Sequence, residues 1–130
     1  MAKRYQAFAA AIGARENCAK SGNAEWYGKW TERLEELEHE MPSGSGFDCG
    51  TKIDLERSTS EKLVFTTSYH HMDDGGSYDG WTEHEVIVTP SLQFGFQVRV
   101  TGRDRNDTKD YIAECFDSTL REDQESLVTA

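Results

Sequence analysis

The sequence predicts a single α+β domain with the element order α-α-β-β-β-β-α, in which three helices cover one face of a four-stranded antiparallel sheet. The chain has 130 residues, a length typical of one domain. Apolar side chains recur at helical spacing up to residue 41 and again from residue 107, whereas they alternate with polar ones over 51–101. The links between the alternating segments are too short for parallel crossovers, which indicates an antiparallel meander.

The first 41 residues predict a helical hairpin. The alanine-rich segment 4–20 has high helix propensity, and Ser21-Gly22-Asn23 then supplies a break and an N-cap. In the second helix, over 23–41, apolar side chains recur at spacings of three and four residues: Tyr27, Trp30, Leu34, Leu37 and Met41. Pro42 and a Ser-Gly run follow, so residues 42–50 are expected to form a flexible linker.

Alternation predicts four strands, over 51–57, 62–71, 81–89 and 92–101. Short-turn pairing sets Val88 opposite Leu92 and His84 opposite both His70 and Phe96. The same pairing gives one face a continuous apolar set, and we expect the helices to cover it. This predicted core face consists of Ile53, Leu55, Val64, Val86, Val88, Phe94, Phe96, Val98 and Val100.

The opposite face is predicted to combine rings with charges, a composition typical of protein interfaces. In the assumed register His71 lies across from Glu83, and Trp81 lies across from Arg99. A slip of one residue in a hairpin would exchange the two faces of a strand. The alternative is that these rings only shield the sheet. The predicted face carries Leu63, Phe65, Tyr69, His71, Trp81, Glu83, Glu85, Ile87, Gln97 and Arg99.

A third helix is predicted over 107–120, and the domain is expected to end with it at residue 120. Its apolar stripe consists of Tyr111, Ile112, Cys115, Phe116, Thr119 and Leu120. Residues 121–130 are polar and lack a clear period, so we expect a disordered tail.

Charge disfavours direct binding to nucleic acid. Fourteen Lys and Arg face 24 Asp and Glu, which gives a formal net charge of −10, whereas phosphate contacts need cations. Between His71 and Pro90 the sequence has no Lys or Arg but five carboxylates: Asp73, Asp74, Asp79, Glu83 and Glu85. Such a field attracts a basic protein partner and speeds its encounter.

The sequence indicates a cytoplasmic protein that does not insert into a membrane. No stretch approaches the roughly 20 apolar residues of a membrane span, and the first residues do not resemble a secretory signal. The three cysteines, an odd number with no Cys-x-x-Cys pair, are typical of a reducing compartment.

Two groups of residues could carry chemistry. His70 and His84, with Asp73 or Asp79, are ligand types for zinc, but their spacing matches no zinc motif. We therefore predict no metal and no cofactor. Glu83, Glu85 and His71 could act as general acids and bases, although no activated nucleophile accompanies them. We therefore assign no catalytic residue, and a small acid–base or metal-dependent enzyme remains the alternative function.

Three segments carry a resemblance: His70-His71-Met72-Asp73, Tyr78-Asp79-Gly80-Trp81-Thr82-Glu83-His84 and Gly102-Arg103-Asp104-Arg105-Asn106-Asp107. Across roughly residues 42–120 the chain resembles small uncharacterised proteins of phages, plasmids and other mobile elements. The resemblance implies an accessory product that binds a host defence protein, as small acidic anti-CRISPR and anti-restriction proteins do.

The leading functional prediction is a non-catalytic binding module that docks on a basic, nucleic-acid-binding protein surface. Carboxylates spread over a sheet can imitate a row of phosphates, while rings supply the desolvated anchor. A third hypothesis is a homodimer formed through the aromatic face. The predicted contacts are Tyr69, His71, Trp81, Glu83, Glu85 and Arg99, with Asp73, Asp74 and Asp79 steering the encounter.

Overall fold

The computed structural model describes residues 3–41, 47–72, 75–91, 95–103 and 108–129, and it confirms the predicted α+β class and element order. The four strands form one antiparallel sheet in the order β1-β2-β3-β4, which is the expected meander. The elements are α1 (Lys3–Ser21), α2 (Ala24–Glu38), β1 (Phe47–Ile53), β2 (Leu63–Met72), β3 (Tyr78–Ser91), β4 (Gly95–Gly102) and α3 (Thr108–Thr129).

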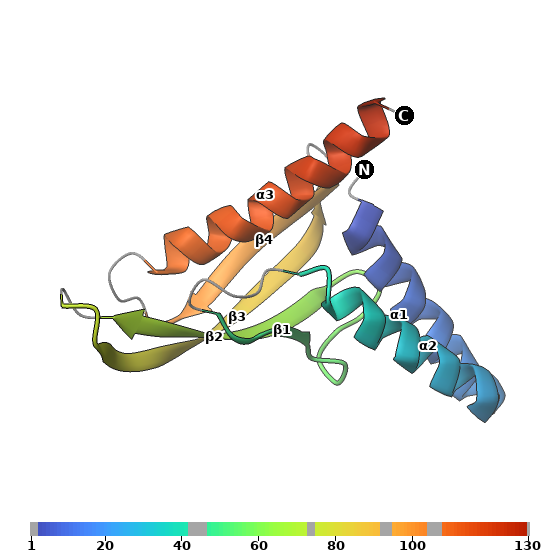
Figure 1. Ribbon diagram of the computed structural model, residues 1–130. Coiled ribbons are helices and arrows are strands. Elements are labelled where there is room, and N and C mark those ends of the chain that lie inside the picture. Colours follow the sequence, from blue (N-terminus) through green and yellow to red (C-terminus); the bar gives the residue numbers. More distant parts are fainter. Residues whose placement is uncertain (1–2, 42–46, 73–74, 92–94, 104–107, 130) are drawn as a thin grey trace.

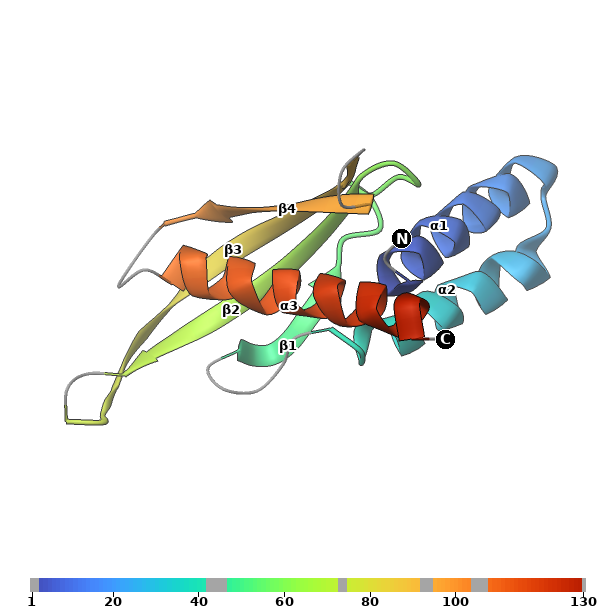
Figure 2. The ribbon, with the colours of Figure 1, turned by 90° about the horizontal axis from the view of Figure 1, so that it is seen from above.

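The three described helices leave one face of the sheet uncovered (Figure 1). Figure 1 shows α3 running along one face, with α1 and α2 packed together at one end of the sheet. Seen from above, α3 crosses over the strands, and the ends of β2 and β3 reach beyond it (Figure 2). Below, the covered face is the one that packs against α3, and the open face is its reverse.

The core forms where α1 and α3 meet the covered face, and Phe65 of β2 lies at its centre. Its ring centroid is 5.1 Å from that of Phe8 and 5.9 Å from that of Phe116. The Tyr5 ring, 6.4 Å from Phe65, completes the contact from α1. The Tyr5 hydroxyl also shares a 2.7 Å hydrogen bond with the Thr119 hydroxyl. Aromatic packing and this bond together fix α1 against α3.

The predicted register between β2 and β3 is wrong, and the error exchanges the faces of β2. Val86 pairs with Phe65 and not with Ser68, an offset of three residues. An odd offset turns every side chain of a strand to the other side. The shift between His70 and Met72 marks an irregularity that a simple turn count does not anticipate. The residues placed on the wrong face are Leu63, Val64, Phe65, Tyr69, His70 and His71.

Val64 and His70 therefore lie on the open face. Val64 pairs with Ile87 and is nevertheless only 2 % exposed. The segment after β1 packs against it, because the Ser58 hydroxyl accepts a 2.9 Å hydrogen bond from the Val64 backbone N–H. His70 pairs with Trp81 and is half-buried.

The register between β3 and β4 also differs from the prediction, but here the faces are preserved. Val88 pairs with Val98 and His84 with Gly102, an offset of six residues from the predicted partners Leu92 and Phe96. An even offset leaves each side chain on its predicted side. Phe96 is buried in the core accordingly, whereas Phe94 lies outside the described residues.

The predicted bounds of β1 and α3 also need correction. β1 occupies Phe47–Ile53 instead of 51–57, so residues 47–50 of the expected linker are strand and 42–46 lie outside the described residues. Leu55 follows β1 in a turn, where it is half-buried against the core. α3 continues to Thr129, through most of the expected tail. Several residues in 121–129, including Arg121, have high helix propensity, a signal that is independent of apolar periodicity.

Candidate functional site

The candidate site lies on the open face of β3, where Trp81 and Glu83 are two residues apart and share that face. The Trp81 side chain is 59 % exposed, and Glu83 is exposed beside it. Ser68 of β2 pairs directly with Glu83. Two of the predicted contact residues are thus brought together here, on a face that no described helix covers (Figure 1).

Glu85, two residues further along β3, differs from Glu83 because its charge is compensated. Its Oε1 lies 2.5 Å from Nη1 of Arg57, and Nε of Arg57 also donates to Oδ2 of Asp54 at 2.7 Å. The hydrogen bond from Arg57 is the main cause that lowers the pKa of Asp54. By contrast, Glu83 forms no ion pair or hydrogen bond through its side chain within the described part of the chain.

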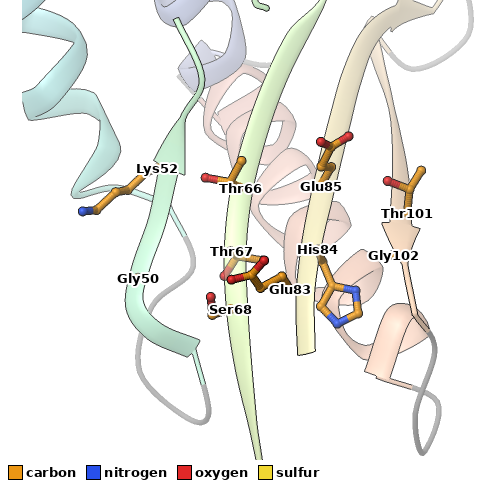
Figure 3. Close-up of a pocket in the computed structure, with 10 residues that line it drawn as sticks. All are labelled: Gly50, Lys52, Thr66, Thr67, Ser68, Glu83, His84, Glu85, Thr101 and Gly102. Atoms are coloured by element: carbon orange, nitrogen blue, oxygen red, sulfur yellow. The ribbon is translucent and has the colours of Figure 1, made fainter. Parts of the chain in front are cut away.

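A polar hollow of about 620 Å³ lies beside these carboxylates. Figure 3 shows the Glu83 side chain reaching from β3 across β2 toward Ser68, with Lys52 on the far strand β1. Thr66 and Thr101 add hydroxyl groups from β2 and β4. Its lining therefore offers one ammonium, several hydroxyls and two carboxylates to a ligand.

The open face carries both signs of charge, in contrast to the anionic surface expected from the sequence. Lys52, Arg99 and Arg103 are exposed around the β3 carboxylates. Arg99 pairs with Ile87, so it does not face Trp81 as predicted. Arg103 instead lines a second hollow of about 560 Å³, together with Trp81, Thr82 and Glu83.

Two of the predicted contacts, Tyr69 and His71, lie on the covered face, which corrects their assignment to the docking surface. The Tyr69 ring contacts His71 at 5.5 Å and Tyr111 of α3 at 5.6 Å between centroids. His71 is only 4 % exposed. Because Glu83 is on the opposite face of the sheet, the proposed acid–base set of His71 and Glu83 is not assembled.

His71 belongs instead to a buried hydrogen-bond network with two residues of β3. The Thr82 hydroxyl lies 2.9 Å from Nε2 of His71 and 2.7 Å from Nε2 of His84. A hydroxyl can donate to one imidazole and accept from the other, so a single threonine bridges Nε2 of one ring and Nε2 of the other. Sequence reasoning missed Thr82 because its partners depend on the register between β2 and β3.

Gly102, on the edge strand β4, pairs with His84 and lies next to this network. Its φ is +119°, a conformation that favours glycine. A Cβ at this position would lie 2.6 Å from the Glu83 carbonyl oxygen and 3.0 Å from Nδ1 of His84. The absence of a side chain therefore lets β4 approach His84 closely.

No activated nucleophile is found among the described residues near this network. Cys115 of α3 is half-buried, and burial raises the pKa of its thiol, which keeps it protonated at neutral pH. The neighbouring Cys115 in turn is the main cause that raises the pKa of Tyr111. Cys18 is a half-buried residue of α1.

Three of the predicted contact residues cannot be placed on the surface. Asp73 and Asp74 lie outside the described residues, and for Asp79 only the backbone is described.

Within the described ranges, no three His, Cys, Asp or Glu side chains gather to hold a metal ion. None of the helices in those ranges is long and apolar enough to cross a membrane. The chain matches no protein-family model, no curated protein and no solved structure.

Proposed function

We propose that the protein is a non-catalytic binding module that docks on a protein partner through the open face of its sheet. Trp81 is the anchor, and Glu83 is the charge that the partner compensates. The observation that carries the proposal is the 59 % exposure of the Trp81 side chain beside a carboxylate without an ion pair in the described chain. Energetic anchors of protein interfaces are enriched in tryptophan, arginine and tyrosine.

The indole of Trp81 contributes little to the fold, since more than half of it is in solvent. An exposed indole keeps a large apolar area in water, and its burial against a partner is favourable by roughly 25 cal/mol per Å². A residue that stabilises only the complex is expected to weaken binding when truncated and to leave the monomer stable.

Charge favours a basic partner. The whole chain has a formal net charge of −10, and the exposed carboxylates of α2, among them Glu32, Glu35 and Glu36, extend the negative field beyond the sheet. Such a field raises the rate of encounter with a cationic surface. Cytoplasmic proteins that bind nucleic acid present surfaces of this kind, and the resemblance to mobile-element proteins favours a counter-defence role.

The test is a comparative capture experiment with the immobilised full chain. The wild type, Trp81→Ala and Trp26→Ala are each exposed to lysate of a host cell, and bound proteins are identified by mass spectrometry. Trp26 is a matched control because it is 48 % exposed on α2, away from the sheet. The captured partner is then purified, and its Kd is measured against all three proteins.

We expect a partner that Trp81→Ala loses and Trp26→Ala retains, with a change in affinity of more than about 1 kcal/mol, or about fivefold in Kd. Equal capture by all three proteins would contradict the proposal. So would a second copy of the chain as the sole Trp81-dependent partner, because light scattering would then show a homodimer.

A further inference from the structure

We propose that the corner formed by Trp81 and Glu83 binds the guanidinium group of an arginine side chain on the partner. This inference rests on the proposed function and names the chemical group that the site recognises. An indole face attracts a cation, and a carboxylate accepts charge-assisted hydrogen bonds from it. The two groups lie two residues apart on the same face of β3.

The same pair of groups already holds a cation elsewhere in the molecule. On α2, Nζ of Lys29 lies 4.5 Å from the centroid of the Trp26 ring. The same Nζ is 3.3 Å from Oε1 of Glu25. Ring and carboxylate therefore share one ammonium group, although all three residues are exposed.

A guanidinium is held in a similar way between the first two helices. Cζ of Arg15 lies 4.3 Å from the centroid of the Tyr27 ring, and Nε of Arg15 donates a 2.9 Å hydrogen bond to the Thr31 hydroxyl. A ring and a neighbouring oxygen are thus sufficient in this chain to orient a planar cation.

The Trp81 corner has the ring and the oxygens, but no described residue places a cation over the Trp81 ring. A hollow of about 560 Å³ leaves space beside the indole and Glu83. Ser68, paired with Glu83 across the strands, supplies a further oxygen. A cation bound between the Trp81 ring and the Glu83 carboxylate would therefore come from a partner.

Arginine fits this corner better than lysine. Its planar guanidinium can stack on the indole while it donates two parallel hydrogen bonds to Glu83. Arg103 lines the same hollow and opposes a second cation by charge repulsion. Removing the Arg103 charge is therefore expected to strengthen the binding of a cationic probe.

The experiment titrates the ¹⁵N-labelled full chain with the peptide acetyl-(Gly-Arg)₃-amide. The readout is the indole N–H signal of Trp81, assigned by its loss in Trp81→Ala. The control peptide replaces arginine with citrulline, which keeps the planar shape but lacks the charge. Trp26 is the internal reference, because Lys29 already occupies its ring.

We expect the arginine peptide to shift the Trp81 signal in a saturable manner, while the citrulline peptide does not. Glu83→Gln should weaken binding about fivefold, since it removes a charge-assisted bond. Glu35→Gln, which changes the net charge equally at an exposed position of α2, should change it by less than about twofold. Arg103→Ala should tighten binding.

Equal shifts from the arginine and citrulline peptides, or equal effects of Glu83→Gln and Glu35→Gln, would overturn the guanidinium assignment. These outcomes are separable from failure of the proposed function. A partner whose capture depends on Trp81 while citrulline and arginine bind alike would leave the docking surface intact and refute only its cation specificity.

Discussion

The two faces of β3 use polar residues in opposite ways. On the covered face, Thr82 and His84 are buried, and the Thr82 hydroxyl is hydrogen-bonded to Nε2 of both His84 and His71. On the open face, Trp81 and Glu83 are exposed and make no such bonds within the described chain. Adjacent residues of one strand thus divide into a set that specifies the fold and a set that is available to a partner. Polar residues close together in the sequence therefore do not form one site when strand alternation separates them.

The largest expected effect is on the covered face, where Phe65→Ala should destabilise the domain by about 3–5 kcal/mol. Phe65 is fully buried among rings from α1 and α3. The measurement is the free energy of unfolding in urea. Ile87→Ala, on the open face and half-buried, is the control and should cost less than half as much. Equal losses would mean that the faces are not distinguished as described.

A smaller loss is expected from Thr82→Val, about 1–3 kcal/mol, because two buried imidazoles lose their shared hydroxyl. Thr66→Val makes the same chemical change on the open face of β2 and should alter stability by less than about 0.5 kcal/mol. Thermal unfolding followed by circular dichroism compares the two. If both variants have the same midpoint, the buried network does not stabilise the fold.

The smallest expected effect is a gain in stability at neutral pH from Asp117→Asn. Burial is the main cause that raises the pKa of Asp117, and Arg121 opposes it. The folded-state pKa is then higher than the unfolded one, so ionisation of Asp117 weakens the fold as pH rises through these values. The variant should be more stable than the wild type at pH 7, by less than about 1 kcal/mol.

This gain should disappear near pH 3, where the carboxyl group is protonated in both states. Urea unfolding at the two pH values measures it. As a control, Asp110→Asn should be destabilising at pH 7, because Asp110 lies in the first turn of α3 and interacts favourably with the helix dipole. A wild type more stable than Asp117→Asn at pH 7 would contradict the assigned cause of the shift.

Local signals in the sequence were sufficient for the elements but not for all of their pairings. The seam of α2 and the alternation in β4 correctly predict which sides of these elements are buried, as Leu34 and Phe96 show. The register of β2 depends on contacts of Phe65 with helices far away in the sequence, and no turn motif records these. The site was therefore predicted only in part. Trp81 and Glu83 lie on the expected face, whereas Tyr69 packs against α3 and His71 lies beside it on the covered face.

The central claim is that Trp81 serves docking and not folding. Its most direct test is the Kd of Trp81→Ala for the purified partner, measured beside its free energy of unfolding. The account predicts that Kd rises by about fivefold or more, while the free energy of unfolding stays within about 0.5 kcal/mol of the wild type. An unchanged Kd, or a loss of affinity that matches an equal loss of stability, would contradict it.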